Sequence, residues 1–514
     1  MKKIKNIFIL LLTISCFMSC DDWLEINPET NVELADQLST AEGFKEMLNG
    51  VYIGMAQENL YGHHLMYGDI EFLAQNYYRD SNPFINFAFT NGSVISRADG
   101  YWGDLYNVIA NINLILDNID ANSDLFNEGD YALLKGEALA LRAFLHFDAF
   151  RLFGEPYVVA STSGNAQIPY ANTAILKRHL HLGAEELFKR IFEDLDAAEA
   201  LLLANDPIVE AYSGDLFDPD QRLYHFNYYA VQALKARAYL TMGDMPNAAM
   251  YAQAVLDNLN FSWATQLDFT GTGSGRKDRL LFNELVSALN VSNLELIAGR
   301  GIFDGDTYPT LVGDYNGIRR IYDVTVIETV IVDPCLPFGF SCEREETTEV
   351  DGPGIFDLRY LNQFGREESS GELANTEKYL QSSNVVTDAY NLYKIVPLIR
   401  ISEMLLIAAE AQVNTDLQAS KDLLDDLKTR RQVELTDYAQ VATDNGITEA
   451  KVVLNEIHKE FRKETYAEGQ TFFMYKRLNL LEIPAGNDLQ ENVTMETDNY
   501  ILPLPQDERE LGNR

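Results

Sequence analysis

Two stretches of this chain combine aromatic rings with amides, carboxylates and a guanidinium, the groups that can hold a carbohydrate. Flat sugar faces carry C–H groups that pack on aromatic rings, while the hydroxyls at their edges need polar partners. The candidate ligand contacts are Tyr77, Tyr78, Arg79, Asn82, Trp263, Phe303, Asp304, Tyr308 and Tyr315. The alternative for both stretches is structural: the rings fill space between helices or inside a small core.

The residue patterns of common enzymes do not occur in the sequence. The seven His residues form no HExxH pattern, and His179 and His181 have no third metal ligand nearby. Gly271–Gly275 matches neither a nucleophile elbow nor a phosphate-binding loop. Two carboxylates about 5 Å apart would suffice for a retaining glycosidase, and spacing along the sequence cannot exclude such a pair. We therefore expect a protein without catalytic residues or cofactor.

A calcium ion is the one metal that the sequence leaves open. Asp304, Asp306 and Asp314 could supply hard oxygen ligands, but the spacing of an EF-hand is missing. We therefore predict no metal site and keep a structural Ca²⁺ as an alternative.

The first twenty residues are typical of an export signal. Lys2, Lys3 and Lys5 precede an apolar run that is too short to span a bilayer. Cys20 closes the segment and is followed by two Asp residues. We predict that residues 1–19 are a lipoprotein signal peptide and that Cys20 is the lipidated first residue. Ordinary secretion with a free cysteine is the alternative.

Cys335 and Cys342 are the two cysteines outside the signal. They flank a six-residue loop between a β-branched run and a polar run, which predicts a hairpin closed by a disulfide in an oxidising compartment. A zinc site is disfavoured because no CxxC pair or nearby His accompanies them.

The charge of the chain excludes some partners. Its 514 residues include 40 Lys and Arg against 78 Asp and Glu, which gives a net charge of −38. Phosphate backbones and anionic membrane surfaces repel such a protein, so we expect no nucleic acid partner.

Apolar residues at three- and four-residue spacing predict a mainly helical protein with few strands. The expected helices cover residues 101–119, 131–153, 182–203, 226–242, 248–259, 398–413, 419–430 and 449–467. The segments that begin at Glu137, Gln232 and Glu403 resemble one another, in the manner of tetratricopeptide repeats.

Turn residues dominate between the repeats. We therefore predict one domain over residues 20–514, with a helical-repeat core at about 40–260 and 392–480. A loop-rich, ligand-binding region at about 261–391 interrupts that core, and we expect it to form a small subdomain.

Six segments, in this order, carry a family resemblance: Cys20–Pro28, Trp102–Asn113, Gly136–Gly154, Ile395–Ala411, Ile457–Phe473 and Leu502–Pro505 with Glu508. Together they resemble the RagB/SusD family of nutrient-binding outer-membrane lipoproteins. The chain departs from the family between Phe461 and Tyr466, where the family usually has Glu-Arg followed by Glu-Leu. A second departure is Met474–Tyr475, where the family usually has Asp-Leu.

The resemblance implies a tetratricopeptide-like SusD fold and a role in uptake. Such proteins are anchored by lipid on the outer face of the outer membrane. They cover a SusC-type TonB-dependent transporter and pass oligosaccharides to it without cleaving them. The alternatives are a peptide-binding member of the same family, a lipid-anchored glycoside hydrolase, and a repeat scaffold that binds only protein.

Overall fold

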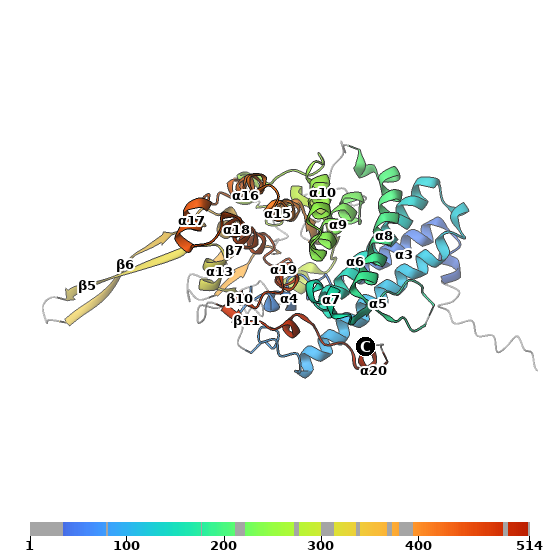
Figure 1. Ribbon diagram of the computed structural model, residues 1–514, viewed down its shortest axis with the longest axis horizontal. Coiled ribbons are helices and arrows are strands. Elements are labelled where there is room, and N and C mark those ends of the chain that lie inside the picture. Colours follow the sequence, from blue (N-terminus) through green and yellow to red (C-terminus); the bar gives the residue numbers. More distant parts are fainter. Residues whose placement is uncertain are drawn as a thin grey trace, which may run out of the picture.

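The computed structural model describes residues 34–78, 81–175, 177–210, 222–271, 277–299, 313–335, 340–366, 373–379, 394–486 and 492–511. Figure 1 shows a helical body from which one long hairpin projects. The predicted signal peptide and Cys20 lie outside the described residues.

Helices make up most of the body, which confirms the predicted fold class. Their bounds are α3 Ala41–Met55, α4 Asp69–Leu73, α5 Gly92–Ile119, α6 Glu128–Phe153, α7 Tyr157–Ser163, α8 Ala184–Asn205, α9 Tyr228–Met242, α10 Met245–Leu256, α11 Gln266–Thr270, α12 Leu294–Gly299, α13 Tyr315–Ile321, α14 Leu358–Asn362, α15 Ile401–Gln412, α16 Leu417–Arg431, α17 Tyr438–Asn445, α18 Glu449–Glu464, α19 Thr471–Leu478 and α20 Gln506–Leu511. Among the described residues, none of these helices is long and apolar enough to cross a membrane.

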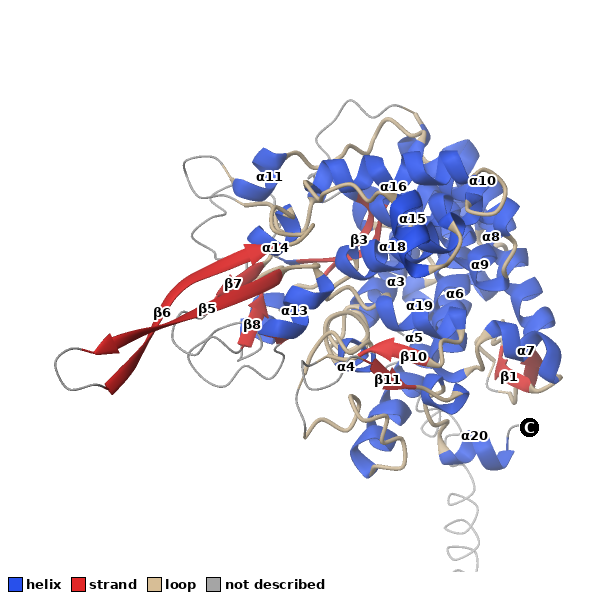
Figure 2. Ribbon diagram, turned by 60° about the vertical axis from the view of Figure 1, so that its left-hand side comes forward, coloured by secondary structure: helices blue, strands red, loops and turns tan. Residues whose placement is uncertain are grey.

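The strands are short apart from one hairpin, and each pairs antiparallel with its neighbour. Their bounds are β1 Ala166–Pro169, β2 His181–Gly183, β3 Leu285–Asn290, β4 Gly313–Asp314, β5 Thr325–Cys335, β6 Phe340–Asp351, β7 Phe364–Arg366, β8 Leu373–Thr376, β9 Ile395–Arg400, β10 Glu482–Pro484 and β11 Asn492–Thr494. They form the pairs β1–β2, β3–β9, β5–β6 and β10–β11 and the three-stranded sheet β4–β8–β7. Figure 2 draws the strands in red beside the blue helices.

The repeat helices stack in an order that crosses the long insertion. α9 packs on α10, α10 packs on α15 and α15 packs on α16, although the whole loop-rich region separates α10 from α15 in sequence. The helices of this stack are neighbours in Figure 1 as well. The structure therefore confirms a helical-repeat core into which the loop-rich region is inserted.

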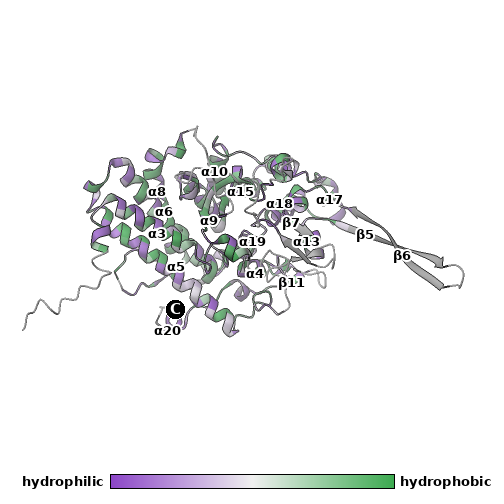
Figure 3. Ribbon diagram, turned by 180° about the vertical axis from the view of Figure 1, so that it is seen from behind, coloured by the Kyte–Doolittle hydropathy of each residue, from purple (hydrophilic) through white to green (hydrophobic). Residues whose placement is uncertain are grey.

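α6 is buried on nearly all sides, and its small residues allow this. Ala138, Ala140 and Ala143 are fully buried, so neighbouring helices can approach closely. The buried Arg142 binds the Asp194 carboxylate on α8, with Nε to Oδ2 at 2.6 Å. Most other helices expose one face, and in Figure 3 the ribbons of α3, α5 and α8 alternate between apolar green and polar purple.

The described part of the loop-rich region does not form an independent subdomain, contrary to our expectation. β3 from this region pairs with β9, which directly precedes α15, and Leu285, Val286 and Ile297 join the main core. A separate apolar cluster contains only Ala264, Phe269, Leu281 and Leu358. The region is therefore held mainly by the core of the helical body.

The pairing of β3 with β9 also corrects a predicted helix. We expected this helix to begin at Leu398, but strand β9 continues to Arg400 and α15 begins at Ile401. Pro397 lies inside the strand and disfavours a helix there. The apolar run looked helical because β9 is buried on both faces.

The predicted hairpin around the two cysteines is present. β5 and β6 pair antiparallel along their length, with Cys335 opposite Phe340 and Cys342 opposite Asp333. The hairpin extends away from the body in both views (Figures 1 and 2). The disulfide itself stays a prediction.

Candidate functional site

The first candidate stretch forms the loop between α4 and α5, residues 74–91, called here the α4–α5 loop. Its turns are built from its own polar side chains: Asn82 Oδ1 accepts a hydrogen bond from the Phe84 N–H at 2.8 Å. Asn91 then caps α5 by accepting from the Ser93 N–H at 2.9 Å. These bonds fix the described part of the loop, so that it can present side chains in defined positions.

The rings of this loop divide into a buried set and a surface set. Phe84 is in the core, whereas Tyr78, Phe87 and Phe89 are half-buried and lie at its edge. Phe87 has a φ of 49°, in the left-handed region that bulky residues avoid at a cost of order 1–2 kcal/mol. Its ring meets that of Phe89 edge to face at 6.4 Å. Strain of this kind at a surface ring is typical of a functional position.

The structure separates the two tyrosines that we selected in this stretch. Tyr77 is only 1% exposed and packs against Phe72 and Tyr466, with ring centroids 5.5 and 5.9 Å apart. Tyr77 therefore fills space in the core, as the structural alternative expects. Tyr78 is half-buried, and of the two rings it is the one that reaches the surface. Arg79 lies outside the described residues, and Asn82 is half-exposed on the loop.

Parts of the two candidate stretches lie close together. Gln75 Oε1 accepts from the Gly486 N–H at 3.4 Å, and the preceding carbonyl, that of Ala485, accepts from Arg320 Nη2 at 3.2 Å. Arg320 belongs to α13, whose first residue is the candidate Tyr315. One short segment, Ala485–Gly486, therefore bridges the α4–α5 loop and α13.

Trp263, a candidate of the second stretch that the structure describes, does not join this surface. Trp263 is half-buried and lies under the Arg430 guanidinium of α16, with Cζ 4.8 Å from the ring centroid. In Figures 1 and 2, α16 lies at the top of the body and α4 below it. Phe303, Asp304 and Tyr308 lie outside the described residues.

A polar cluster beside the α4–α5 loop was missed by the sequence analysis. The Asp69 carboxylate contacts Arg97 Nε at 3.2 Å and His64 Nδ1 at 3.3 Å, and accepts from the Tyr101 hydroxyl at 2.5 Å. Burial opposes its charge, but these partners outweigh burial and lower the pKa of Asp69. Asp69 and Arg97 are far apart in sequence and on different helices, so no spacing rule could pair them.

This cluster does not suit a metal ion. One ligand atom each from Glu58, His63 and His64 lies within 4.8 Å of the others. However, Arg97 Nη1 is 2.7 Å from His64 Nε2. A guanidinium only donates hydrogen bonds, so His64 Nε2 is the acceptor and is already occupied. The positive charge of Arg97 beside His64 would also repel a cation. Of the three aspartates considered for calcium, Asp304 and Asp306 lie outside the described residues.

Several buried carboxylates cluster in the interior, but they are not placed for hydrolysis. The side chains of Glu284 and Glu464 are 0% exposed, and both contact Arg431. Glu464 also binds Arg359 and Arg400. A substrate cannot reach these groups, and their charges are already paired, so this cluster joins helices and strands rather than attacking a bond.

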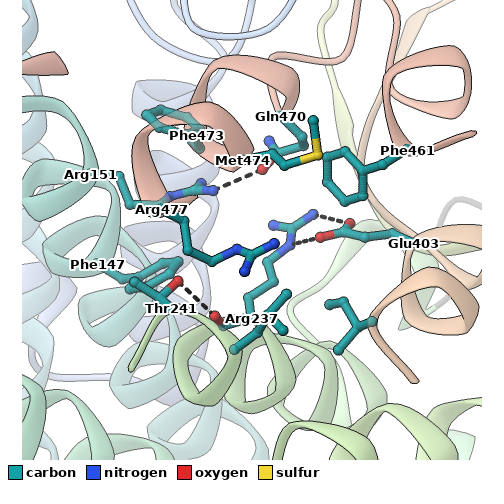
Figure 4. A pocket seen from close by; sticks show the side chains of 12 residues that line it. Phe147, Arg151, Arg237, Thr241, Glu403, Phe461, Gln470, Phe473, Met474 and Arg477 are labelled. Carbon is teal, nitrogen blue, oxygen red and sulfur yellow. Dashed lines mark hydrogen bonds and ion pairs between the residues drawn. The ribbon is translucent and has the colours of Figure 1, made fainter. Parts of the chain in front are cut away.

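Figure 4 shows a cavity where α6, α9, α15, α18 and α19 meet. Three guanidiniums line it, and each has a partner: Arg237 binds Glu403, Arg151 donates to Gln470 at 2.8 Å, and Arg477 binds Glu410 outside the view. The cavity measures about 40 Å³, which is room for about one water molecule. It is therefore too small for a sugar.

Two family profiles match the chain. One, described as "Starch-binding associating with outer membrane", covers residues 22–240, and the other, described as "SusD family", covers residues 360–511. The α4–α5 loop lies in the first match, and Ala485–Gly486 lies in the second.

Full-length relatives and solved structures agree with these profiles. The chain is 24% identical to the SusD-like protein P38 of Formosa agariphila, covering 93% of this chain and 92% of the relative. It is 24% identical to the SusD-like protein P2 of the same species, covering 98% and 97%. A structure described as a SusD-like carbohydrate binding protein from Bacteroides vulgatus superimposes with a TM-score of 0.65 at 16% identity, covering 92% and 96%.

Proposed function

Because the chain belongs to the RagB/SusD family, we propose that it is a non-catalytic, glycan-binding lipoprotein that delivers oligosaccharides to a SusC-type TonB-dependent transporter. The α4–α5 loop surface is the observation that supports glycan binding most directly. It combines the half-buried rings of Tyr78, Phe87 and Phe89 with the amides of Asn82 and Asn86. Rings and amides on one short, internally bonded loop offer both the stacking faces and the polar partners that a sugar needs.

The predicted second half of the site comes from the chain around α13. Asn316 and Arg320 are exposed on this helix, and Ala485–Gly486 joins it to the loop. In this proposal Tyr315, Phe303, Asp304 and Tyr308 complete the site from the same stretch. Trp263 is assigned to packing against α16, because the guanidinium of Arg430 lies over its ring.

The proposed location is the outer face of the outer membrane, through lipid on Cys20. An apolar segment at residues 7–14 followed by Cys20 supports this anchor, since an acyl chain contributes about 0.8 kcal/mol for each buried methylene. Labelled palmitate should be incorporated into the native protein and lost in Cys20→Ser. Incorporation that persists in this variant would contradict the assignment of Cys20.

A binding screen of the purified mature protein tests the glycan proposal. Neutral oligosaccharides, acidic oligosaccharides and short peptides are measured by calorimetry, and reducing ends released from each glycan are measured in parallel. Saturable binding of a glycan without release of reducing ends is the expected result. Binding of peptides alone would assign the peptide-binding alternative, and release of reducing ends would assign the hydrolase.

Co-purification from membranes tests the transporter. A β-barrel protein should be retained with the tagged chain when it is solubilised in mild detergent. If a barrel is retained but no glycan or peptide binds, the protein is a scaffold that binds only protein.

A further inference from the structure

A second cavity lies along α5, the helix that follows the α4–α5 loop, and none of the loop residues lines it. It measures about 440 Å³ and is lined by α5, the segment between β1 and β2, and α20. This volume is within the range of about 300–1,000 Å³ that is typical of small-molecule sites. A neighbouring cavity of about 500 Å³ is lined by Glu155 and by Asn165 and Gln167, which already donate to Glu155.

Two aromatic rings on α5 form one wall of the 440 Å³ cavity. The ring centroids of Trp102 and Tyr106 are 4.5 Å apart. The Tyr106 hydroxyl donates to the Pro169 carbonyl at 2.9 Å, and Asn113 Nδ2 donates to the Ala171 carbonyl at 3.0 Å. These bonds hold the segment after β1 against the helix, so the rings stand in fixed positions and little entropy is lost when a ligand stacks on them.

Three consecutive basic residues also line the cavity. Lys177, Arg178 and His179 follow one another in a chain with a net charge of −38. Neither Lys177 nor His179 forms an ion pair or hydrogen bond with any residue that the structure describes. Burial, together with the positive charge of Lys177, lowers the pKa of His179. A negative charge placed here would gain the ammonium of Lys177 as an ion-pair partner and an N–H of the neutral His179 imidazole as a hydrogen-bond donor.

Acidic residues on α20 limit how much negative charge the cavity accepts. Asp507 and Glu508 line it as well, and Glu508 contacts His181 at 3.0 Å. A polyanion would meet these carboxylates, whereas a ligand with one acidic group can direct that group to the basic side.

We propose that this cavity binds a saccharide unit carrying a single acidic group, which packs against the half-buried ring of Tyr106 beside Trp102, pairs with the ammonium of Lys177 and accepts a hydrogen bond from His179. The inference takes the glycan class of ligand from the proposed function but uses a separate surface. A carboxylate and a sulfate ester share the required charge, so both sources are tested.

Calorimetry with three matched disaccharides tests the proposal: a galacturonosyl-galactose with one carboxylate, a singly sulfated galactose disaccharide and neutral digalactose. At least one acidic sugar should bind at least tenfold more tightly than the neutral one. Lys177→Ala combined with His179→Ala should remove this preference, whereas Lys189→Ala, which removes an exposed lysine on α8, should keep it. Equal binding of the acidic and neutral sugars, or acidic binding that survives the double substitution, would overturn the proposal.

A blocking variant separates this site from the α4–α5 loop. Ala110 is exposed on α5 and lines the cavity, so Ala110→Phe should fill it without disturbing the core. This change should abolish the acidic preference and leave glycan binding at the α4–α5 loop intact. Conversely, Phe87→Ala should weaken glycan binding at the loop and leave the preference for acidic sugars unchanged. The two variants therefore show separately whether the proposed function of the loop or the proposal for the cavity is wrong.

Discussion

Arg431 and Glu464 bind each other through two hydrogen bonds in the interior, where both side chains are 0% exposed. Nε of Arg431 donates to Oε1 at 2.6 Å, and Nη2 donates to Oε2 at 3.1 Å. The pair joins the end of α16 to the end of α18, and Glu284 contacts the same guanidinium from the segment before β3. The insertion and the repeat core are thus tied at one buried charge cluster.

Glu464→Gln should lower the free energy of unfolding by about 3–5 kcal/mol, because it removes one charge and leaves its cationic partners buried with less compensation. Denaturant unfolding followed by circular dichroism measures this loss. Asp426→Asn is the matched control. It breaks an exposed ion pair between Asp426 and Arg430, both on α16, and should lower the free energy of unfolding by at most about 1 kcal/mol. Equal losses in the two variants would contradict the role assigned to the buried cluster.

Glu410 should make stability depend on pH in the acid range. Burial opposes its charge, but Arg477 and His458 outweigh burial and lower the pKa of Glu410 to about 2. Since its unfolded pKa is near 4.5, its contribution is fully present above that pH and is lost as the pH falls towards 2. The difference in unfolding free energy between the native protein and Glu410→Gln should shrink by about 3 kcal/mol over this interval.

Glu71 should show the opposite dependence. Burial raises its pKa to about 7, although Asn76 and the N–H groups of Ala467 and Gly469 donate to it. The folded protein therefore holds this proton more tightly than the unfolded chain, and Glu71 costs stability as the pH rises from about 4.5 to 7. Relative to the native protein, Glu71→Gln should gain stability over that range in the same unfolding series. A constant difference would contradict the raised pKa.

The ring of Phe87 should contribute to glycan affinity at the α4–α5 loop. Phe87→Ala is expected to weaken binding by about 1–2 kcal/mol, a loss in the range measured for interface anchors, whereas Phe87→Tyr should keep most of the affinity. Calorimetry with a glycan from the screen measures both variants. Phe356→Ala removes an exposed ring outside the loop, on the segment before α14, and should not change glycan affinity. If Phe87 and Phe356 behave alike, the loop surface is not the site.

The hairpin should carry a disulfide between Cys335 and Cys342. Alkylation of the unfolded, unreduced mature protein is expected to modify neither cysteine, and prior reduction should expose both to the reagent. Peptide mass spectrometry distinguishes these states. Modification without reduction would show that the thiols are free.

Local patterns sufficed for most of the helical core but not for the surroundings of the site. The spacing of Leu105, Ile109 and Ile112 predicts α5 because a buried helical face repeats within the element itself. The burial of Tyr77 could not be foreseen, because it depends on Tyr466, which is distant in sequence. Contacts between residues distant in sequence also escaped prediction elsewhere. Examples are the ion pair of Arg97 with Asp69 and the hydrogen bond between Gln75 and Gly486. Tertiary contacts decide which rings of a polar, aromatic stretch face water.

The packing of α10 on α15 has a consequence for how the chain is made. Synthesis proceeds from the N-terminus, so α10 emerges long before α15. Until α15 follows, the side of α10 that packs on it faces solvent or a chaperone. Closing this contact late, across a long intervening segment, should make the docking of the C-terminal helices a slow step of folding and the nascent protein prone to aggregate before it.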